Sequence, residues 1–204
     1  MSYVGGLSVG LAANDVVVMA AERRYSLGTF IASKTGVRKL VPVADHIALA
    51  ATGIPADVQF LARIISVQAE LYRLENDRLI SCKAAAKLLS NYLYSTRLSF
   101  PKYVEPLMGG FDSQPRLVML DVAGSINEEQ YAVTGTSARI ALGVLEEGFT
   151  EEMDKKTARS LVLRAVNAGI HRDTASGDHI DLVIVEKDEM KAEEIEINDR
   201  SAND

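Results

Sequence analysis

Charged residues directly follow the most apolar stretch of the chain. Val16 to Ala21 is a continuous apolar run, and Glu22, Arg23 and Arg24 come immediately after it. Charged side chains are almost never fully buried unless they are paired. Two interpretations follow. Either the strand ends there and the charges are solvated, or the charges are paired, in which case Lys39, which opens another apolar strand, is the obvious partner for Glu22.

Two further polar segments have residue types that suit a site. His171 to Asp178 is a loop between a buried helix and a buried strand, rich in groups that hydrogen-bond the backbone, as a plain loop or helix C-cap also is. Thr52 to Asp57 takes a strand into a helix, which leaves backbone N–H groups free at a helix N-terminus. Such N–H groups form a natural oxyanion site, although many ordinary helices begin in the same way.

The elements that must position these residues follow from the apolar pattern. Short apolar runs and alternation predict strands at 7–11, 16–21, 39–43, 47–52, 104–110, 117–122, 131–134, 180–186 and 193–197. Spacings of three and four predict helices at 58–76, 85–96, 138–145 and 158–169. Runs of strands with helices in pairs predict an α+β fold, in which two antiparallel sheets are each covered on the outer side by helices.

Composition excludes several function classes. The 204 residues are 48% hydrophobic and 25% charged, as in an ordinary globular domain that can bury a core. The net charge of -6 argues against nucleic acid or an anionic membrane as the main partner. No apolar run approaches the ~20 residues of a membrane span, and nothing at the start resembles a signal peptide, so we expect a cytoplasmic protein. Cys82 is the single cysteine, no Cys/His cluster has zinc spacing, and we expect no metal or cofactor.

Eight short motifs occur together along the chain. They are Gly5-Gly6 with Val9-Gly10, Ala20-Ala21-Glu22-Arg23-Arg24, Arg38-Lys39-Leu40, Thr52-Gly53 followed by Asp57, Met108-Gly109-Gly110-Phe111-Asp112, Thr134-Gly135-Thr136, Gly143-Val144-Leu145-Glu146 and Arg172-Asp173-Thr174-Ala175-Ser176-Gly177. In order and spacing they resemble the β subunits of archaeal proteasomes, over essentially the whole chain to about Glu186. The resemblance implies the N-terminal-nucleophile hydrolase fold, a four-layer αββα sandwich that agrees with the pattern above.

The resemblance also implies a threonine endopeptidase. In this family the Oγ of an N-terminal threonine attacks the peptide carbonyl, and the α-amine of the same residue is the general base. An α-amine has a reference pKa of ~7.7–8.0, near the neutral pH at which a general base works best. The chain terminus therefore holds both the nucleophile and its proton acceptor.

The supporting residues of the site are carried over by motif. Lys39 resembles the lysine that favours deprotonation of the nucleophile, and Glu22 the acidic residue that pairs with this lysine. Asp173 and Ser176 match the residues that hydrogen-bond around the terminal amine, and Thr136 stands where many members have serine.

The substrate side of the site is carried over in the same way. Gly53 matches the glycine whose N–H stabilises the tetrahedral oxyanion. Tyr25, Ala51 and Pro55 are expected to line the pocket for the side chain before the cut. Ala51 at the floor of this pocket leaves room for a large apolar group, although Tyr25 would fill part of it.

Gly6 departs from the family pattern, because it stands where the threonine is expected. Glycine has no hydroxyl and cannot attack a carbonyl. Family members mature by cutting between a glycine and the threonine, and Gly5-Gly6 is the corresponding bond. Loss of the nucleophile lowered kcat by about 10⁶ in another hydrolase, so we expect the chain to be inactive and residues 1–5 to stay attached. Ser2 lies four residues too early to substitute, more than about 10 Å along an extended strand.

Two histories fit Gly6. It is an engineered Thr→Gly change that traps an inactive particle, which the retained supporting residues favour, or the subunit is naturally silent and builds a mixed ring beside an active β subunit. A third interpretation, the simpler bacterial ATP-dependent peptidase of the same fold, is disfavoured by the long helical segment 54–98 and by the C-terminal extension.

Partners and domain limits follow from the resemblance. In the family, β subunits form seven-membered rings, two such rings stack, and α rings cap both ends. An AAA ATPase or another regulator feeds unfolded protein substrates to the α ring. We expect a propeptide-like leader at 1–5, a single β-type domain at 6–197 and a polar tail at 198–204.

Overall fold

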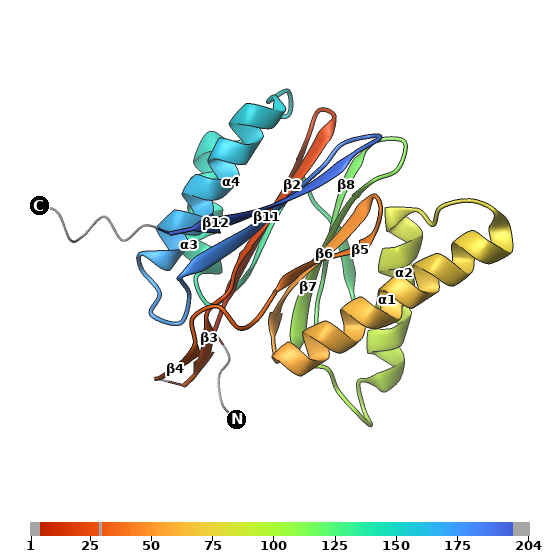
Figure 1. The fold of residues 1–204 in the computed structure, drawn as a ribbon, viewed down its shortest axis with the longest axis horizontal. Helices are drawn as coiled ribbons and strands as arrows, with labels where there is room; N and C mark the ends of the chain where they lie inside the picture. Colours follow the sequence, from red (N-terminus) through yellow and green to blue (C-terminus); the bar gives the residue numbers. More distant parts are fainter. Residues whose placement is uncertain (1–4, 29, 198–204) are drawn as a thin grey trace, which may run out of the picture.

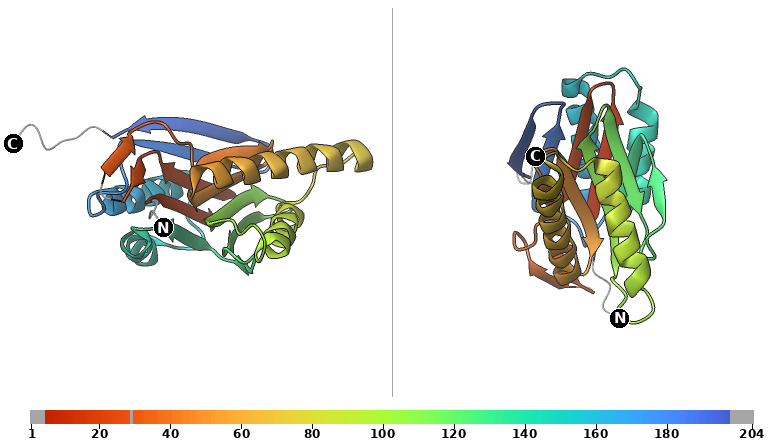
Figure 2. Two further views of the ribbon diagram at one scale, coloured as in Figure 1. Left: turned by 90° about the horizontal axis from the view of Figure 1, so that it is seen from below. Right: turned by 90° about the vertical axis from the view of Figure 1, so that its right-hand side faces the viewer.

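Two antiparallel sheets packed face to face form the centre of the molecule, and a pair of helices covers each outer face (Figure 1). The computed structural model describes residues 5–28 and 30–197. Figure 2 shows the same four layers from two further sides. This arrangement confirms the four-layer αββα prediction. Residues 1–4 of the leader predicted at 1–5, and the whole tail predicted at 198–204, lie outside the described residues.

The first sheet has the strand order β10-β1-β2-β11-β12. Its central strand β2 is buried along its whole length, as its continuous apolar run predicts. Asn14, with φ 45°, makes the tight turn from β1 into β2. The strands are β1 (Leu7–Ala13), β2 (Val16–Glu22), β10 (Tyr131–Gly135), β11 (His179–Val185) and β12 (Met190–Glu196).

Helices α3 (Ala138–Gly148) and α4 (Lys155–Ile170) cover the outer face of this sheet. Asp154 caps α4, because its Oδ1 accepts a hydrogen bond of 2.8 Å from the N–H of Thr157. Leu7, at the start of β1, is completely buried in the apolar cluster that the helices and the sheet share. The start of β1, which the site uses, therefore has a fixed position.

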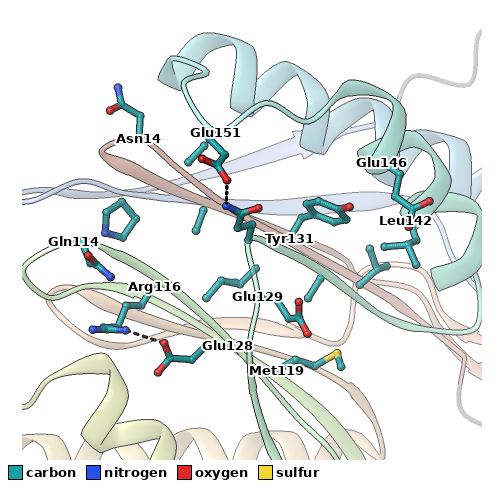
Figure 3. Close-up of a pocket in the computed structure, with 17 residues that line it drawn as sticks. Asn14, Gln114, Arg116, Met119, Glu128, Glu129, Tyr131, Leu142, Glu146 and Glu151 are labelled. Atoms are coloured by element: carbon teal, nitrogen blue, oxygen red, sulfur yellow. Dashed lines mark hydrogen bonds and ion pairs between the residues drawn. The ribbon is translucent and has the colours of Figure 1, made fainter.

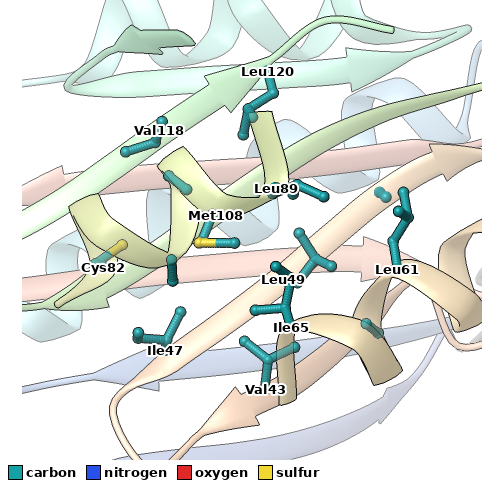
Figure 4. Packing of buried hydrophobic residues seen from close by; sticks show 14 of the residues in the cluster. Val43, Ile47, Leu49, Leu61, Ile65, Cys82, Leu89, Met108, Val118 and Leu120 are labelled. Atoms are coloured by element: carbon teal, nitrogen blue, oxygen red, sulfur yellow. The ribbon is translucent and has the colours of Figure 1, made fainter. Parts of the chain in front are cut away.

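The second sheet has the order β5-β6-β7-β8-β9, and its outer face carries α1 (Pro55–Asn76) and α2 (Cys82–Thr96). Leu49 and Met108 from the sheet meet Leu61 and Leu89 from the helices in one apolar cluster (Figure 4). The strands are β5 (Leu40–Ala44), β6 (Ile47–Gly53), β7 (Val104–Phe111), β8 (Pro115–Leu120) and β9 (Ile126–Glu128).

A third apolar cluster joins the inner faces of the two sheets and includes Met19 and Leu107. Glycines at this interface let the sheets approach. A Cβ on Gly10 would lie 2.7 Å from Leu117 Cδ1, and a Cβ on Gly109 would collide with the Met19 sulfur. Dense packing here holds one sheet against the other.

Some predicted boundaries differ from the structure. The strand expected at 117–122 ends at Leu120, because Asp121 Oδ1 accepts hydrogen bonds of 2.8 Å from the N–H groups of Ala123 and Ser125 and so forms a turn. The hairpin of β3 (Tyr25–Leu27) and β4 (Phe30–Ser33) was not predicted. Within the described ranges, none of the helices has the length and apolar character needed to cross a membrane.

Candidate active site

Gly6 directly precedes β1 and lies beside Glu22, at the end of β2, and Lys39, just before β5. A Cβ added to Gly6 would lie 3.0 Å from Lys39 Nζ and 3.3 Å from Glu22 Oε1. A side chain at position 6 would therefore point directly at an ion pair between Lys39 and Glu22.

Glu22 is completely buried, and its carboxylate accepts hydrogen bonds from several segments of the chain. Its Oε1 accepts from Lys39 Nζ and, at 3.2 Å, from the N–H of Leu7. Its Oε2 accepts from the N–H groups of Arg24, at 2.7 Å, and Gly177, at 3.1 Å. Burial raises the pKa of Glu22, while Lys39 and these N–H donors act in the opposite direction.

Lys39 is only 2% exposed, which is rare for a lysine. Besides Glu22, its ammonium donates to the carbonyl oxygen of Arg24 at 2.7 Å. An ammonium carries three N–H donors, so one remains beyond these two bonds for a group on residue 6. The backbone of Lys39 is held as well, because its carbonyl accepts from the N–H of Ala51 at 2.8 Å.

The interpretation that the charges after β2 are solvated is wrong. Glu22 is completely buried, and Arg23 is 6% exposed and pairs with Asp181 and Glu194. The strand does end at Glu22, but Glu22 and Arg23 are both buried and both have partners, as burial of charge requires.

Thr136 holds residue 6 at both ends of its backbone. Its Oγ1 accepts from the N–H of Gly6 at 3.3 Å, and its own N–H donates to the carbonyl oxygen of Gly6 at 2.9 Å. The Thr136 hydroxyl is also bonded to Asp173 Oδ2, which accepts from Ser176 Oγ at 2.7 Å. The structure thus places Thr136 against the nitrogen of residue 6, and Asp173 and Ser176 are joined to it through the Thr136 hydroxyl.

The 173–178 loop is held by Arg24, one of the charges after the apolar 16–21 run, whose partner in this loop the sequence does not indicate. Its guanidinium bonds both oxygens of Asp178, at 2.7 and 2.9 Å, and the carbonyl of Thr174 at 2.9 Å. Gly5 is buried against this loop, and a Cβ there would collide with Ala175. The two adjacent arginines were the available signal, but nothing local pairs Arg24 with a residue 154 positions away.

The substrate side of the site comes from the end of β6. Gly53 has φ 121°, a left-handed conformation that favours glycine, and a Cβ there would collide with the carbonyl of Tyr103. Ala51 is buried, and Pro55 is the first residue of α1. Tyr25 is half-buried at the start of β3. In the described chain no hydrogen bond joins Gly53, Tyr25 or Pro55 to Gly6, so their roles stay predictions.

A large groove of about 970 Å³ lies elsewhere, between the sheets (Figure 3). Asn14, Arg116, Tyr131 and Glu146 are among the residues that line it. Its edge at Asn14 is at the far end of β1 from Gly6, eight residues or about 26 Å away at the ordinary rise of a strand. The residues that line it do not include Gly6, Glu22, Lys39, Thr136, Asp173 or Ser176, so the groove is separate from the cluster around Gly6.

Comparison with known proteins identifies the family. Residues 3–185 match the family described as "Proteasome subunit". The chain belongs to this family. It is 40% identical to "Proteasome subunit beta 2" of Pyrobaculum arsenaticum, with 95% of each chain covered. It is 41% identical to "Proteasome subunit beta 1" of Hyperthermus butylicus, with 95% of this chain and 98% of the relative covered.

The protein is thus a proteasome β subunit of the archaeal type, as the motifs predicted. Proteasome β subunits assemble with α subunits in rings, and by family this chain is a threonine endopeptidase. The structure places Glu22, Lys39 and Thr136 against Gly6, with Asp173 and Ser176 bonded in turn behind Thr136. Their catalytic roles, and the effect of glycine at position 6, stay predictions.

Proposed function

We propose that this β subunit builds the threonine-protease site completely except for its nucleophile, and is therefore catalytically inactive with Gly6. One observation carries the proposal: the vacant Cβ position of Gly6 lies 3.0 Å from Lys39 Nζ. A threonine side chain placed there would bring its hydroxyl against a buried ammonium, which favours the alkoxide.

The same geometry supports the proton transfers that a threonine would need. With threonine at position 6, its freed α-amine takes the proton from Oγ as Oγ attacks the peptide carbonyl, and then gives that proton to the leaving amine. Thr136 Oγ1 is bonded to the nitrogen of residue 6, and to Asp173, so it orients this base. The N–H of Gly53 stabilises the negative oxygen of the tetrahedral intermediate. Glycine has no side-chain oxygen, so the first of these steps cannot take place.

The substrate is an unfolded protein chain, supplied through the α ring by an AAA ATPase or another regulator. Tyr25, Ala51 and Pro55 form the pocket for the side chain before the scissile bond. Since alanine is small, a pocket with Ala51 at its floor accepts a large apolar residue.

The test is the Gly6→Thr variant, co-assembled with its α subunit, with Gly6→Ala as the matched control that adds a Cβ without a hydroxyl. Mass spectrometry follows the loss of residues 1–5, and a fluorogenic peptide with a large apolar residue before the cut follows turnover. We expect Gly6→Thr to be processed and active, and Gly6→Ala and the unchanged chain to be intact and inactive, with a kcat lower by about 10⁶.

A correctly assembled Gly6→Thr particle without activity would contradict the proposal. Turnover by the unchanged chain would contradict it equally. Activity of Gly6→Thr would support Gly6 as an engineered Thr→Gly change in an otherwise working site.

A second candidate is a naturally non-catalytic subunit of a mixed ring. It is favoured by two relatives of this chain from one organism, Ignicoccus hospitalis, named "Proteasome subunit beta 1" and "Proteasome subunit beta 2", each 40% identical to it. An active second β subunit would then supply the nucleophile, and this chain would build the ring. Co-assembly with an active β subunit into one ring, together with an inactive Gly6→Thr variant, is the result expected of this candidate.

A further inference from the structure

The candidate site is assembled across the two sheets. Gly6, Glu22 and Thr136 come from or directly adjoin strands of the first sheet, whereas Gly53 ends β6 in the second sheet. A nucleophile must stand at a fixed distance from its oxyanion donor, and a misplacement of about 1 Å can lower the rate by about 10². Contacts that set one sheet against the other at this end therefore matter to the chemistry.

Glu105 makes such a contact. It lies on β7, directly opposite Thr52 of β6, and its side chain reaches the first sheet. Its Oε2 accepts from the N–H of Gly135, at the end of β10, at 3.2 Å. The hydroxyl of Thr52 lies 3.4 Å from the same oxygen and 3.3 Å from Thr134 Oγ1, so one carboxylate and two hydroxyls join β6, β7 and β10.

Gly135 is the residue whose backbone lies against Gly6. Its φ of 105° is left-handed, and a Cβ on it would collide with the carbonyl oxygen of Gly6. The next N–H, of Thr136, donates to that carbonyl at 2.9 Å. Fixing the N–H of Gly135 therefore fixes the segment that holds residue 6.

We propose that Glu105 is a positioning residue for the reaction, which ties β10 to the second sheet so that residue 6 faces Gly53. The proposal rests on the function proposed above. Glu105 acts as a hydrogen-bond acceptor for the N–H of Gly135. Because the Glu105 residue is exposed, its truncation leaves no cavity in the core, and we expect the free energy of unfolding to stay close to that of the parent.

The matched pair Glu105→Gln and Glu105→Ala tests this in the Gly6→Thr background, co-assembled with the α subunit. The glutamine keeps an oxygen acceptor for Gly135, and the alanine removes it. We expect Glu105→Ala to lower kcat by about 10- to 100-fold with KM changed by less than about twofold, and Glu105→Gln to restore most of the loss. The melting temperature and the assembly of both variants should match those of the parent.

Three results would overturn the proposal. They are an unchanged kcat in Glu105→Ala, a Glu105→Gln variant as slow as Glu105→Ala, or a rise in KM alone, which would indicate direct substrate contact.

Amide hydrogen exchange tests the role of Glu105 without relying on catalytic activity, and so independently of the proposed function. In the unchanged chain with Gly6, the amide of Gly135 should exchange faster in Glu105→Ala than in Glu105→Gln. The amide of Ala12, which donates to Gln130 at the far end of β1, is the internal control and should not change. If the Gly6→Thr parent is inactive, the proposed function fails, while equal Gly135 exchange in both variants refutes the role of Glu105.

Discussion

Replacing Lys39 by methionine would leave a buried carboxylate without its cationic partner. Lys39 is 2% exposed and Glu22 is completely buried. Removing one member of a buried ion pair costs about 3–5 kcal/mol in the free energy of unfolding, because the remaining charge stays desolvated. Methionine is unbranched and fills the space of the lysine's aliphatic stem. The loss of stability in this variant therefore comes from the missing positive charge and not from a cavity.

The loss should depend on pH with a defined sign. Burial already raises the pKa of Glu22 above its ordinary value of 4.5, and Lys39 opposes this rise. Without Lys39 the folded-state pKa rises further, so the folded chain binds a proton that the unfolded chain has released. The free energy of unfolding of the variant must therefore fall as pH rises from about 4.5 towards the folded-state pKa, by at most about 1.4 kcal/mol per pH unit.

Urea unfolding of the isolated subunit, followed by circular dichroism between pH 5 and pH 8, measures this directly. We expect the difference in the free energy of unfolding between the unchanged chain and Lys39→Met to be smallest near pH 5 and to grow towards pH 8. The double variant Glu22→Gln/Lys39→Met is the control and should lose this added slope, because it lacks the carboxylate. A difference that is constant with pH, that shrinks as pH rises, or that persists in the double variant would refute the reasoning.

Two further predictions concern glycines and the single cysteine. Gly135→Ala should lower the melting temperature, because its Cβ would meet the carbonyl of Gly6. Gly143→Ala, in open space within α3, should instead stabilise the fold by about 0.5–1 kcal/mol. Similar shifts in melting temperature for both variants would contradict this steric assignment. Burial, reinforced by Asp112, raises the pKa of the Cys82 thiol to about 12, so iodoacetamide at pH 8 should label Cys82 only after unfolding in urea. Rapid labelling of the folded chain would show that the thiol is accessible and ionised.

The helices and the buried strands were predictable because their signals are local. The three–four spacing that predicts α2 and α4 places their apolar residues on one face, and the run in β2 reflects a strand covered on both sides. The hairpin β3–β4 was missed because its strands have three and four residues, too few to show a period. Exposed Phe30 and Ile31 in β4 break the expected alternation as well.

The contacts of the site divide in the same way. The pairing of Glu22 with Lys39 was predicted, because each is a charge beside an apolar strand and such charges need partners. The hydrogen bond from the N–H of Gly135 to Glu105 was not predicted, because a charged residue in a strand is ordinarily expected to face solvent, and Glu105 is indeed exposed.

The sequence by itself determined the family, through motifs along the chain, and the absence of a hydroxyl at Gly6, which is a matter of covalent chemistry. Only the tertiary structure decided that the vacant side-chain position of Gly6 points at Lys39, and that the charges after β2 are buried. The physical reason is that these distances depend on how two sheets pack, which brings together residues far apart in the chain.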